Sequence, residues 1–161
     1  MIQKMKKHLL QLVGMLALLV GVTSCEGWEI IGGGGSQETP VELTRCWHMV
    51  SFCDAPADVD IYIDFGKDGN FAIYQRSKEL SYTVFNGTYT NDEENSVIAG
   101  VYDDGTPWLS SYYYVVDKEA KSLTLTSVET PSEVAVYELA EVPASATLSS
   151  RSASVNDVKP L

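Results

Sequence analysis

The side chains of this sequence best suited to covalent or metal chemistry are three cysteines, Cys25, Cys46 and Cys53, and a histidine, His48. Thiols and an imidazole can bind zinc, or supply a nucleophile and its base. Cys46, His48 and Cys53 lack the paired spacing of a zinc site, and the pattern does not bring a nucleophile, a base and a carboxylate together. Most acidic residues fall in polar stretches, where contact with solvent explains them. We therefore expect no catalytic residue, no metal site and no cofactor, and so not an enzyme.

Cys46 and Cys53 could instead form a disulfide, which requires Cα atoms within about 7 Å of each other. The two cysteines are seven residues apart, and an extended strand of that length spans about 23 Å. Residues 48–52 between them contain no turn signal. We therefore predict two free, partly buried thiols; a disulfide would require the chain to turn sharply between them.

Cys25 follows a stretch with the order of a secretory leader. A basic start at residues 4–7 precedes an apolar run, 9–22, that is shorter than the about 20 residues of a membrane span. The stretch resembles a bacterial lipoprotein signal, with Ser24 before the cut and Cys25 as the acylated first residue, although Val22 stands where such signals usually carry leucine. This resemblance implies a signal peptide over 1–24 and a membrane anchor on Cys25, at the cell envelope and most readily the outer membrane. An ordinary signal peptide with an incidental cysteine is the alternative.

Residues 25–42 have the composition of a tether. Four consecutive glycines at 32–35 provide no side chains to pack and maximal backbone freedom. A flexible link of this length reaches roughly 20–24 Å, which is enough to hold a small domain clear of lipid headgroups.

The charge of the chain restricts its partners. Once the three lysines of the leader are removed, eight basic residues remain against 22 acidic ones, a net charge of −14. Such a surface repels nucleic acid and anionic lipid headgroups. We therefore expect no nucleic-acid partner, and membrane attachment only through the acyl chains on Cys25.

Eight stretches alternate between apolar and polar residues or are rich in β-branched and aromatic side chains, as half-buried strands are. These stretches are 43–52, 59–65, 70–76, 81–90, 96–102, 108–117, 123–128 and 134–139. Short turns join them, such as 66–70 with its Asp-Gly pair, and predict antiparallel pairing in chain order. We therefore expect an all-β domain over 43–139, an eight-stranded up-and-down meander closed into a barrel, with a two-sheet sandwich as the alternative.

Residues 140–161 differ in composition from the predicted strands. Alanine, serine and threonine dominate, and large apolar residues are few. Such a segment has little surface to bury against its ordering entropy. We therefore expect a flexible or loosely docked C-terminal tail.

Five segments of the predicted barrel together resemble one known family. They are 43–47 (LTRCW), 61–71 (IYIDFGKDGNF), 86–89 (NGTY), 98–102 (IAGVY) and 123–126 (LTLT). They are similar to the lipocalin-like lipoproteins of the Bacteroides group, over about 43–139. That family commonly carries a glycine two residues before the tryptophan of the first strand, whereas Arg45 precedes Trp47 here. The resemblance implies a small lipocalin-like barrel with a pocket, without naming a ligand.

Aromatic residues on several strands predict the lining of that pocket. A tyrosine hydroxyl buried without a partner costs about 1–3 kcal/mol, so inward tyrosines favour a wet mouth or a ligand with polar groups. The predicted ligand-binding residues are Trp47, Phe85, Tyr89, Trp108, Tyr112 and Tyr137. The alternative is that aromatic side chains simply fill the barrel. Alternation leaves open whether Tyr112 and Tyr114 or their neighbours point inward.

Three function classes remain, of which an enzyme is the least favoured. The first is a lipid-anchored barrel that binds a small apolar or amphipathic molecule, not strongly anionic. The second is an interaction module, a subunit or adhesin with a filled barrel, that meets a protein or glycan through exposed tyrosines such as Tyr62 and Tyr113. The sequence leaves the oligomeric state open.

Overall fold

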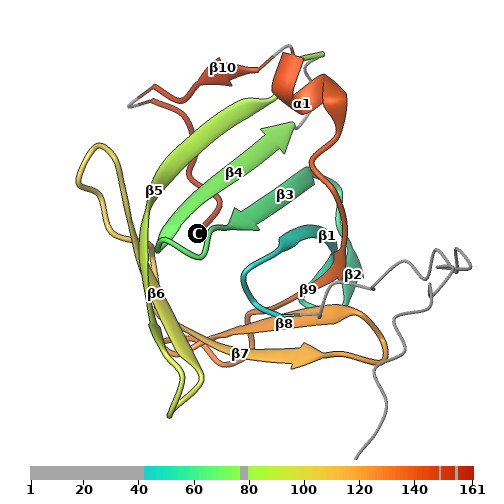
Figure 1. The fold of residues 1–161 in the computed structure, drawn as a ribbon, viewed down its shortest axis with the longest axis vertical. Helices are drawn as coiled ribbons and strands as arrows, with labels where there is room; N and C mark the ends of the chain where they lie inside the picture. Colours follow the sequence, from blue (N-terminus) through green and yellow to red (C-terminus); the bar gives the residue numbers. More distant parts are fainter. Residues whose placement is uncertain (1–41, 77–79, 149, 155) are drawn as a thin grey trace, which may run out of the picture. The chain divides into compact units, whose positions relative to one another are not determined.

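The structure is a computed structural model that describes residues 42–76, 80–148, 150–154 and 156–161. Eight antiparallel strands form a closed barrel (Figure 1). They are β1 (Cys46–Phe52), β3 (Asp60–Phe65), β4 (Asn70–Arg76), β5 (Thr83–Asp92), β6 (Val97–Tyr102), β7 (Tyr112–Asp117), β8 (Ser122–Ser127) and β9 (Val134–Leu139). Neighbours in the chain pair with each other, and β9 pairs with β1 to close the ring. The predicted all-β, up-and-down, lipocalin-like barrel is therefore confirmed.

The strands form where the sequence alternates. In β3 and β8 every second residue is buried, because successive side chains of a strand point to opposite faces. Between β3 and β4 the chain turns at Gly69, whose φ of 80° is a conformation that glycine adopts without strain. The Asp68 carboxylate also accepts a hydrogen bond from the Asn70 backbone N–H at 3.2 Å. The Asp-Gly turn thus sets the register Phe65↔Phe71.

Two of the strands are shorter than their sequence pattern suggests. The first begins at Cys46, because residues 43–45 bend and the Arg45 N–H donates to the Leu43 carbonyl. Likewise β7 begins at Tyr112 rather than at Trp108. The Trp108 N–H donates to the Gly100 carbonyl, so this residue lies in a loop that folds back on β6.

β1 is extended between the two cysteines, as the sequence predicts, and both thiols are free. Cys46 is buried, and burial, assisted by the nearby Asp64 carboxylate, raises the pKa of its thiol to about 12. Cys53 is exposed, so the prediction that it is partly buried is wrong, because it lies in a turn where it and Asp54 adopt positive φ values of 49° and 61°. This turn directs the chain into β2 (Ala55–Pro56), which pairs back onto β1.

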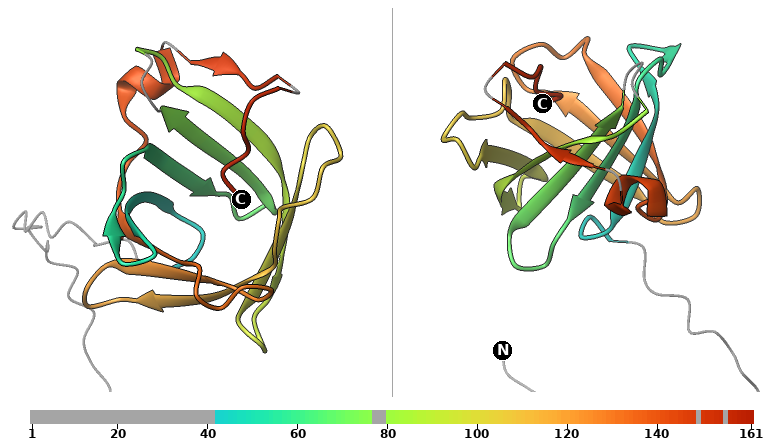
Figure 2. Two further views of the ribbon diagram at one scale, coloured as in Figure 1. Left: turned by 180° about the vertical axis from the view of Figure 1, so that it is seen from behind. Right: turned by 90° about the horizontal axis from the view of Figure 1, so that it is seen from above.

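The described residues of the segment 140–161 pack on the barrel, in contrast to the flexible or loosely docked tail expected from composition. A short helix, α1 (Ala144–Leu148), buries Ala146 completely. After it, β10 (Arg151–Ser152) pairs in parallel with the start of β5. The segment then runs to the barrel interior, where Leu161 is only 5% exposed (Figures 1 and 2). A few well-placed contacts, rather than many apolar residues, hold it.

Within the ranges that the structure describes, no helix is long and apolar enough to cross a membrane.

Candidate functional site: an apolar cavity in the barrel

A cavity of about 600 Å³ opens at one mouth of the barrel. Its walls come from facing strands: Met49 on β1, Ile61 on β3, Leu125 on β8 and Ala135 on β9. Four other hollows on the described chain hold about 240 to 400 Å³ and have a more polar lining. Small-molecule sites usually measure roughly 300–1,000 Å³ and are mostly apolar. This cavity is therefore the candidate functional site.

Two tyrosine hydroxyls give the cavity its internal polar groups. Tyr112 and Tyr137 line it, and within the described residues neither hydroxyl has a hydrogen-bond partner. Burial raises the pKa of both, and Glu133 and Glu129 contribute for Tyr112, which reaches about 12. Both groups therefore remain neutral hydroxyls that can donate or accept a hydrogen bond across the physiological pH range.

The charge around the cavity is one-sided. Of the lining residues that the structure describes, Asp58 and Glu133 carry side-chain carboxylates, and none is a lysine, arginine or histidine. Phe52 and Leu109 are 47% and 84% exposed and add apolar surface to the same lining. The mouth therefore disfavours anionic ligands and suits neutral or cationic molecules with an apolar part.

Two of the six predicted ligand-binding residues, Tyr112 and Tyr137, line the cavity. The structure also resolves which side chains of β7 point inward, a question the sequence left open. Tyr112 and Tyr114 pack against the core, whereas Tyr113 and Val115 are 50% and 65% exposed. The other four predicted residues do not line this cavity. They are Trp47, Phe85, Tyr89 and Trp108.

These four aromatic residues instead belong to the packed part of the interior. Trp47 is fully buried, and its indole N–H donates to the Leu43 carbonyl at 2.9 Å. The Tyr89 hydroxyl donates to the Gly66 carbonyl at 2.9 Å, so this partly buried polar group has a partner without a ligand. Phe85 packs edge-on against Tyr102, with ring centroids 6.1 Å apart, and it borders two of the smaller, more polar hollows. The interior is thus partly filled and partly hollow.

Trp108 occupies the centre of the filled part. Its ring lies 5.1 Å from that of Phe71 and 6.4 Å from that of Phe65, between centroids. A Cβ atom on Gly100 would lie 2.2 Å from the Trp108 ring, so only glycine leaves room for the indole here. The Trp108 indole N–H is buried and has no hydrogen-bond partner among the described residues.

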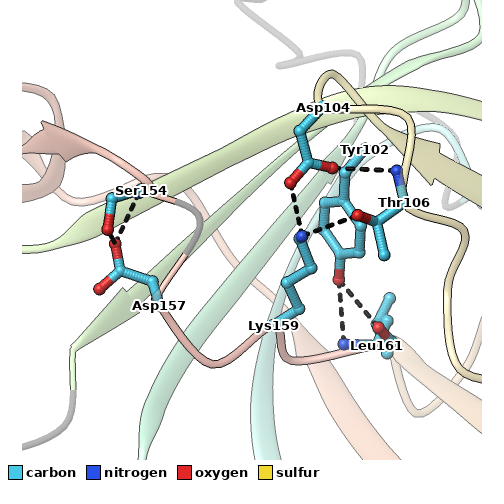
Figure 3. Close-up of polar contacts among 7 residues, drawn as sticks. All are labelled: Tyr102, Asp104, Thr106, Ser154, Asp157, Lys159 and Leu161. Atoms are coloured by element: carbon cyan, nitrogen blue, oxygen red, sulfur yellow. Dashed lines mark hydrogen bonds and ion pairs between the residues drawn. The ribbon is translucent and has the colours of Figure 1, made fainter.

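Apart from Tyr112 and Tyr137, the sequence prediction named none of the residues that line the cavity, and two of those missed, Pro160 and Leu161, come from the C-terminal segment. Leu161 is the larger surprise, since it comes from the segment expected to be loosely docked. Its N–H donates to the Tyr102 hydroxyl at 3.1 Å, and that hydroxyl donates to the Leu161 main-chain oxygen at 3.0 Å (Figure 3). No local signal could have found this contact, because 59 residues separate the partners.

A second polar cluster lies away from the cavity, around Asp60. The Asp60 carboxylate accepts hydrogen bonds from Arg76 and Tyr82, each at 2.6 Å, and lies 2.9 Å from His48 Nε2. Burial by itself would raise the pKa of Asp60, but the hydrogen bonds from Tyr82, Arg76 and His48 outweigh it and lower that pKa. His48 also stacks on Tyr62 with ring centroids 4.3 Å apart. With its carboxylate engaged by three partners, the cluster ties β1, β3 and β4 together.

Cys25, the predicted lipidation site, lies outside the described residues. In the part of the chain that the structure describes, no group of three or more histidine, cysteine, aspartate or glutamate residues could hold a metal ion. No family model matches the sequence, and no curated protein and no solved structure matches it either. The fold and the cavity therefore define a class, a closed antiparallel barrel with an apolar mouth, and carry the functional argument by themselves.

Proposed function

We propose that this protein is a lipid-anchored, lipocalin-like barrel of the cell envelope that binds a small apolar or amphipathic molecule without acting as an enzyme. The single observation that carries the binding proposal is the cavity of about 600 Å³, whose lining is mostly apolar. Burial of apolar ligand surface contributes about 25 cal/mol per Å² before the costs of binding. A cavity of this volume is large enough for a molecule with one or two rings or a short acyl chain.

The polar groups of the cavity narrow the ligand class. Tyr112 and Tyr137 offer hydroxyls inside, and Asp58 and Glu133 offer carboxylates, with no basic residue among the described residues of the lining. A ligand with a hydrogen-bonding group and no negative charge satisfies both. We therefore favour a neutral or cationic amphipathic ligand over a fatty acid.

Binding is tested with N-phenyl-1-naphthylamine, a neutral apolar fluorophore that brightens out of water. Ala135 is 7% exposed and lines the cavity, so Ala135→Phe should fill part of it and weaken probe binding at least tenfold. Val115 is 65% exposed on β7, so Val115→Phe is the matched control and should leave the affinity unchanged. Binding that is insensitive to Ala135→Phe would contradict the cavity as the site.

The charge preference is tested by competition. Dodecyltrimethylammonium should displace the probe at lower concentration than dodecyl sulfate, which has the same chain and the opposite charge. Equal or reversed potency would contradict a mouth that disfavours anions. Native mass spectrometry of the protein purified from its own membranes, before and after lipid extraction, would identify the natural ligand by its mass.

The interaction-module reading is supported by one observation, the outer face of β7, where Tyr113 and Val115 are half exposed or more. This second function would be favoured if the probe does not bind and if the Tyr113→Ser variant no longer binds a protein or glycan partner that the wild-type protein binds.

A further inference from the structure

We propose that residues 156–161, here called the closing segment, form a strap that occupies part of the cavity and is displaced when a ligand takes the whole of it. This inference rests on the proposed function and adds a regulatory step to it. Pro160 and Leu161 line the cavity, and Leu161 packs with the core. The chain itself thus supplies an apolar side chain where an apolar ligand would lie.

The tip of the closing segment is held by one buried hydroxyl. Tyr102 is 3% exposed, and its hydroxyl accepts a hydrogen bond from the Leu161 N–H and donates one to the Leu161 main-chain oxygen. Pro160 has no N–H to donate. An amphipathic ligand with a donor and an acceptor could make the same two hydrogen bonds with Tyr102, so displacement of Leu161 need not leave this hydroxyl without a partner.

Two residues before Leu161, the Lys159 side chain clamps the closing segment to the loop after β6. Its Nζ lies 2.6 Å from the Asp104 carboxylate and 3.0 Å from the Thr106 hydroxyl (Figure 3). It also lies 5.3 Å from the centre of the Tyr102 ring. The Lys159 and Asp104 side chains remain 20% and 36% exposed, and ion pairs in contact with water are weak and screened by salt. The clamp therefore favours the closed position without fixing it.

The base of the closing segment is held differently. The Asp157 carboxylate accepts hydrogen bonds from both terminal nitrogens of the Arg151 guanidinium, each at 2.7 Å, and from the Ser154 N–H at 2.7 Å. Arg151 belongs to β10, which pairs with β5 through main-chain hydrogen bonds. The Arg151 and Asp157 side chains are 44% and 20% exposed, so solvent screens this pair too, but its two parallel hydrogen bonds fix its geometry and make it stronger than a single contact. The base thus stays attached while the tip can leave, which is the arrangement of a strap.

Displacement of the strap has a measurable thermodynamic consequence. A ligand that fits only the emptied cavity must compete with Leu161. Its apparent affinity is therefore lower when a larger fraction of the molecules has the strap docked. Any change that weakens docking without touching the cavity should therefore strengthen ligand binding. Lys159 is such a position, since it holds the strap and does not line the cavity.

The experiment measures the affinity of N-phenyl-1-naphthylamine for the full chain and for single variants. Leu161→Gly removes the plugging side chain and should raise the affinity about fivefold or more. Lys159→Ala should raise it two- to threefold. Val158, next to the clamp and 80% exposed, provides the control Val158→Ala, which should change nothing. Circular dichroism of each variant checks that the barrel remains folded.

A second readout separates a strap from a fixed wall. With saturating probe, hydrogen exchange of the Leu161 amide should become faster, because the ligand releases it from Tyr102. Slower exchange on binding would overturn the proposal, because a fixed wall becomes more protected when the cavity fills.

The outcomes also separate this inference from the proposed function. If the wild-type protein binds the probe and neither Leu161→Gly nor Lys159→Ala strengthens binding, the strap is overturned and the binding function stands. If only Leu161→Gly and Lys159→Ala bind, the strap is supported in its strongest form. If neither the wild-type protein nor Leu161→Gly binds, both proposals fail.

Discussion

Replacing Gly100 by alanine tests whether the packing of Trp108 fixes the filled part of the barrel. The new Cβ would lie 2.2 Å from Trp108 Cε2, 2.5 Å from Cζ2 and 2.7 Å from Cδ2. Carbon atoms normally approach to about 3.5 Å, so the strand and the ring must separate by about 1.3 Å. The indole is 5% exposed and is enclosed by the rings of Phe65, Phe71 and Tyr112, so it has no free space to enter.

The expected penalty follows from this confinement. Overpacking a core usually costs about 1–3 kcal/mol, and we place Gly100→Ala in the upper half of that range, about 2–3 kcal/mol. In a domain of this size the midpoint of thermal unfolding should fall by about 10 °C. The sign of the change in the free energy of unfolding is diagnostic. Where nothing obstructs the side chain, glycine inside a strand is about 0.5–1 kcal/mol less favourable than alanine, so Gly100→Ala would then stabilise the protein.

Urea unfolding followed by circular dichroism measures the free energy of unfolding of each variant. Val101→Ile adds one carbon on the same strand at a residue that is 42% exposed, and should stay within about 0.5 kcal/mol of the wild-type protein. In a Trp108→Leu background the penalty of Gly100→Ala should disappear or reverse, giving a coupling energy of about 2–3 kcal/mol. Full stability of Gly100→Ala, or an equal penalty in both backgrounds, would refute the reasoning.

Three further predictions concern the anchor, the Asp60 cluster and the thiols. Cys25→Ala should release the protein from the membrane pellet into the soluble fraction, and continued sedimentation would show that Cys25 is not the anchor. Asp60→Asn should lower the free energy of unfolding at neutral pH by about 2–4 kcal/mol, because it removes the charged acceptor of three hydrogen bonds. Because the pKa of Asp60 is lower in the folded protein, this stabilisation is complete at pH values above the ordinary pKa of 3.8 and is lost as the pH falls below that value. In urea titrations, the difference in stability between the wild-type protein and Asp60→Asn should therefore shrink below about pH 4. A difference that does not depend on pH would contradict this account. A thiol reagent added to the folded protein near pH 8 should modify exposed Cys53 and leave Cys46 unmodified until the protein unfolds, because Cys46 is buried and its pKa is raised to about 12. Mass spectrometry of the labelled peptides measures the extent of modification at each cysteine. Rapid labelling of Cys46 in the folded protein would contradict its burial.

Most of the barrel was readable from local patterns. Alternation of period two, or enrichment in β-branched and aromatic residues, located all eight strands, because such side chains suit a strand with one buried face. Short turns with Asp-Gly pairs fixed antiparallel pairing between neighbours, and closure followed because it removes two exposed edges. The extended path of β1 between Cys46 and Cys53 followed from the absence of a turn signal.

What the sequence could not decide depended on contacts between distant residues. Alternation assigns alternate faces of a strand but not which face is inward, so the inward position of Tyr112 needed the register of β7 on β8. The division of the aromatic residues between core and cavity was equally hidden, because Trp108, in the loop after β6, fills space that Gly100 leaves on β6.

The C-terminal segment gives the clearest separation between the two sources of information. Its composition alone determined that it has little apolar surface and therefore little tendency to order by itself. Only the tertiary structure decided that it docks, through one leucine held by a buried hydroxyl 59 positions away and one ion pair between Lys159 and Asp104, 55 positions apart. The sequence by itself thus determined a barrel with one dry face, since burial patterns are local. The three-dimensional arrangement determined where that barrel is hollow and what closes it, since a cavity is formed by side chains that no local pattern relates.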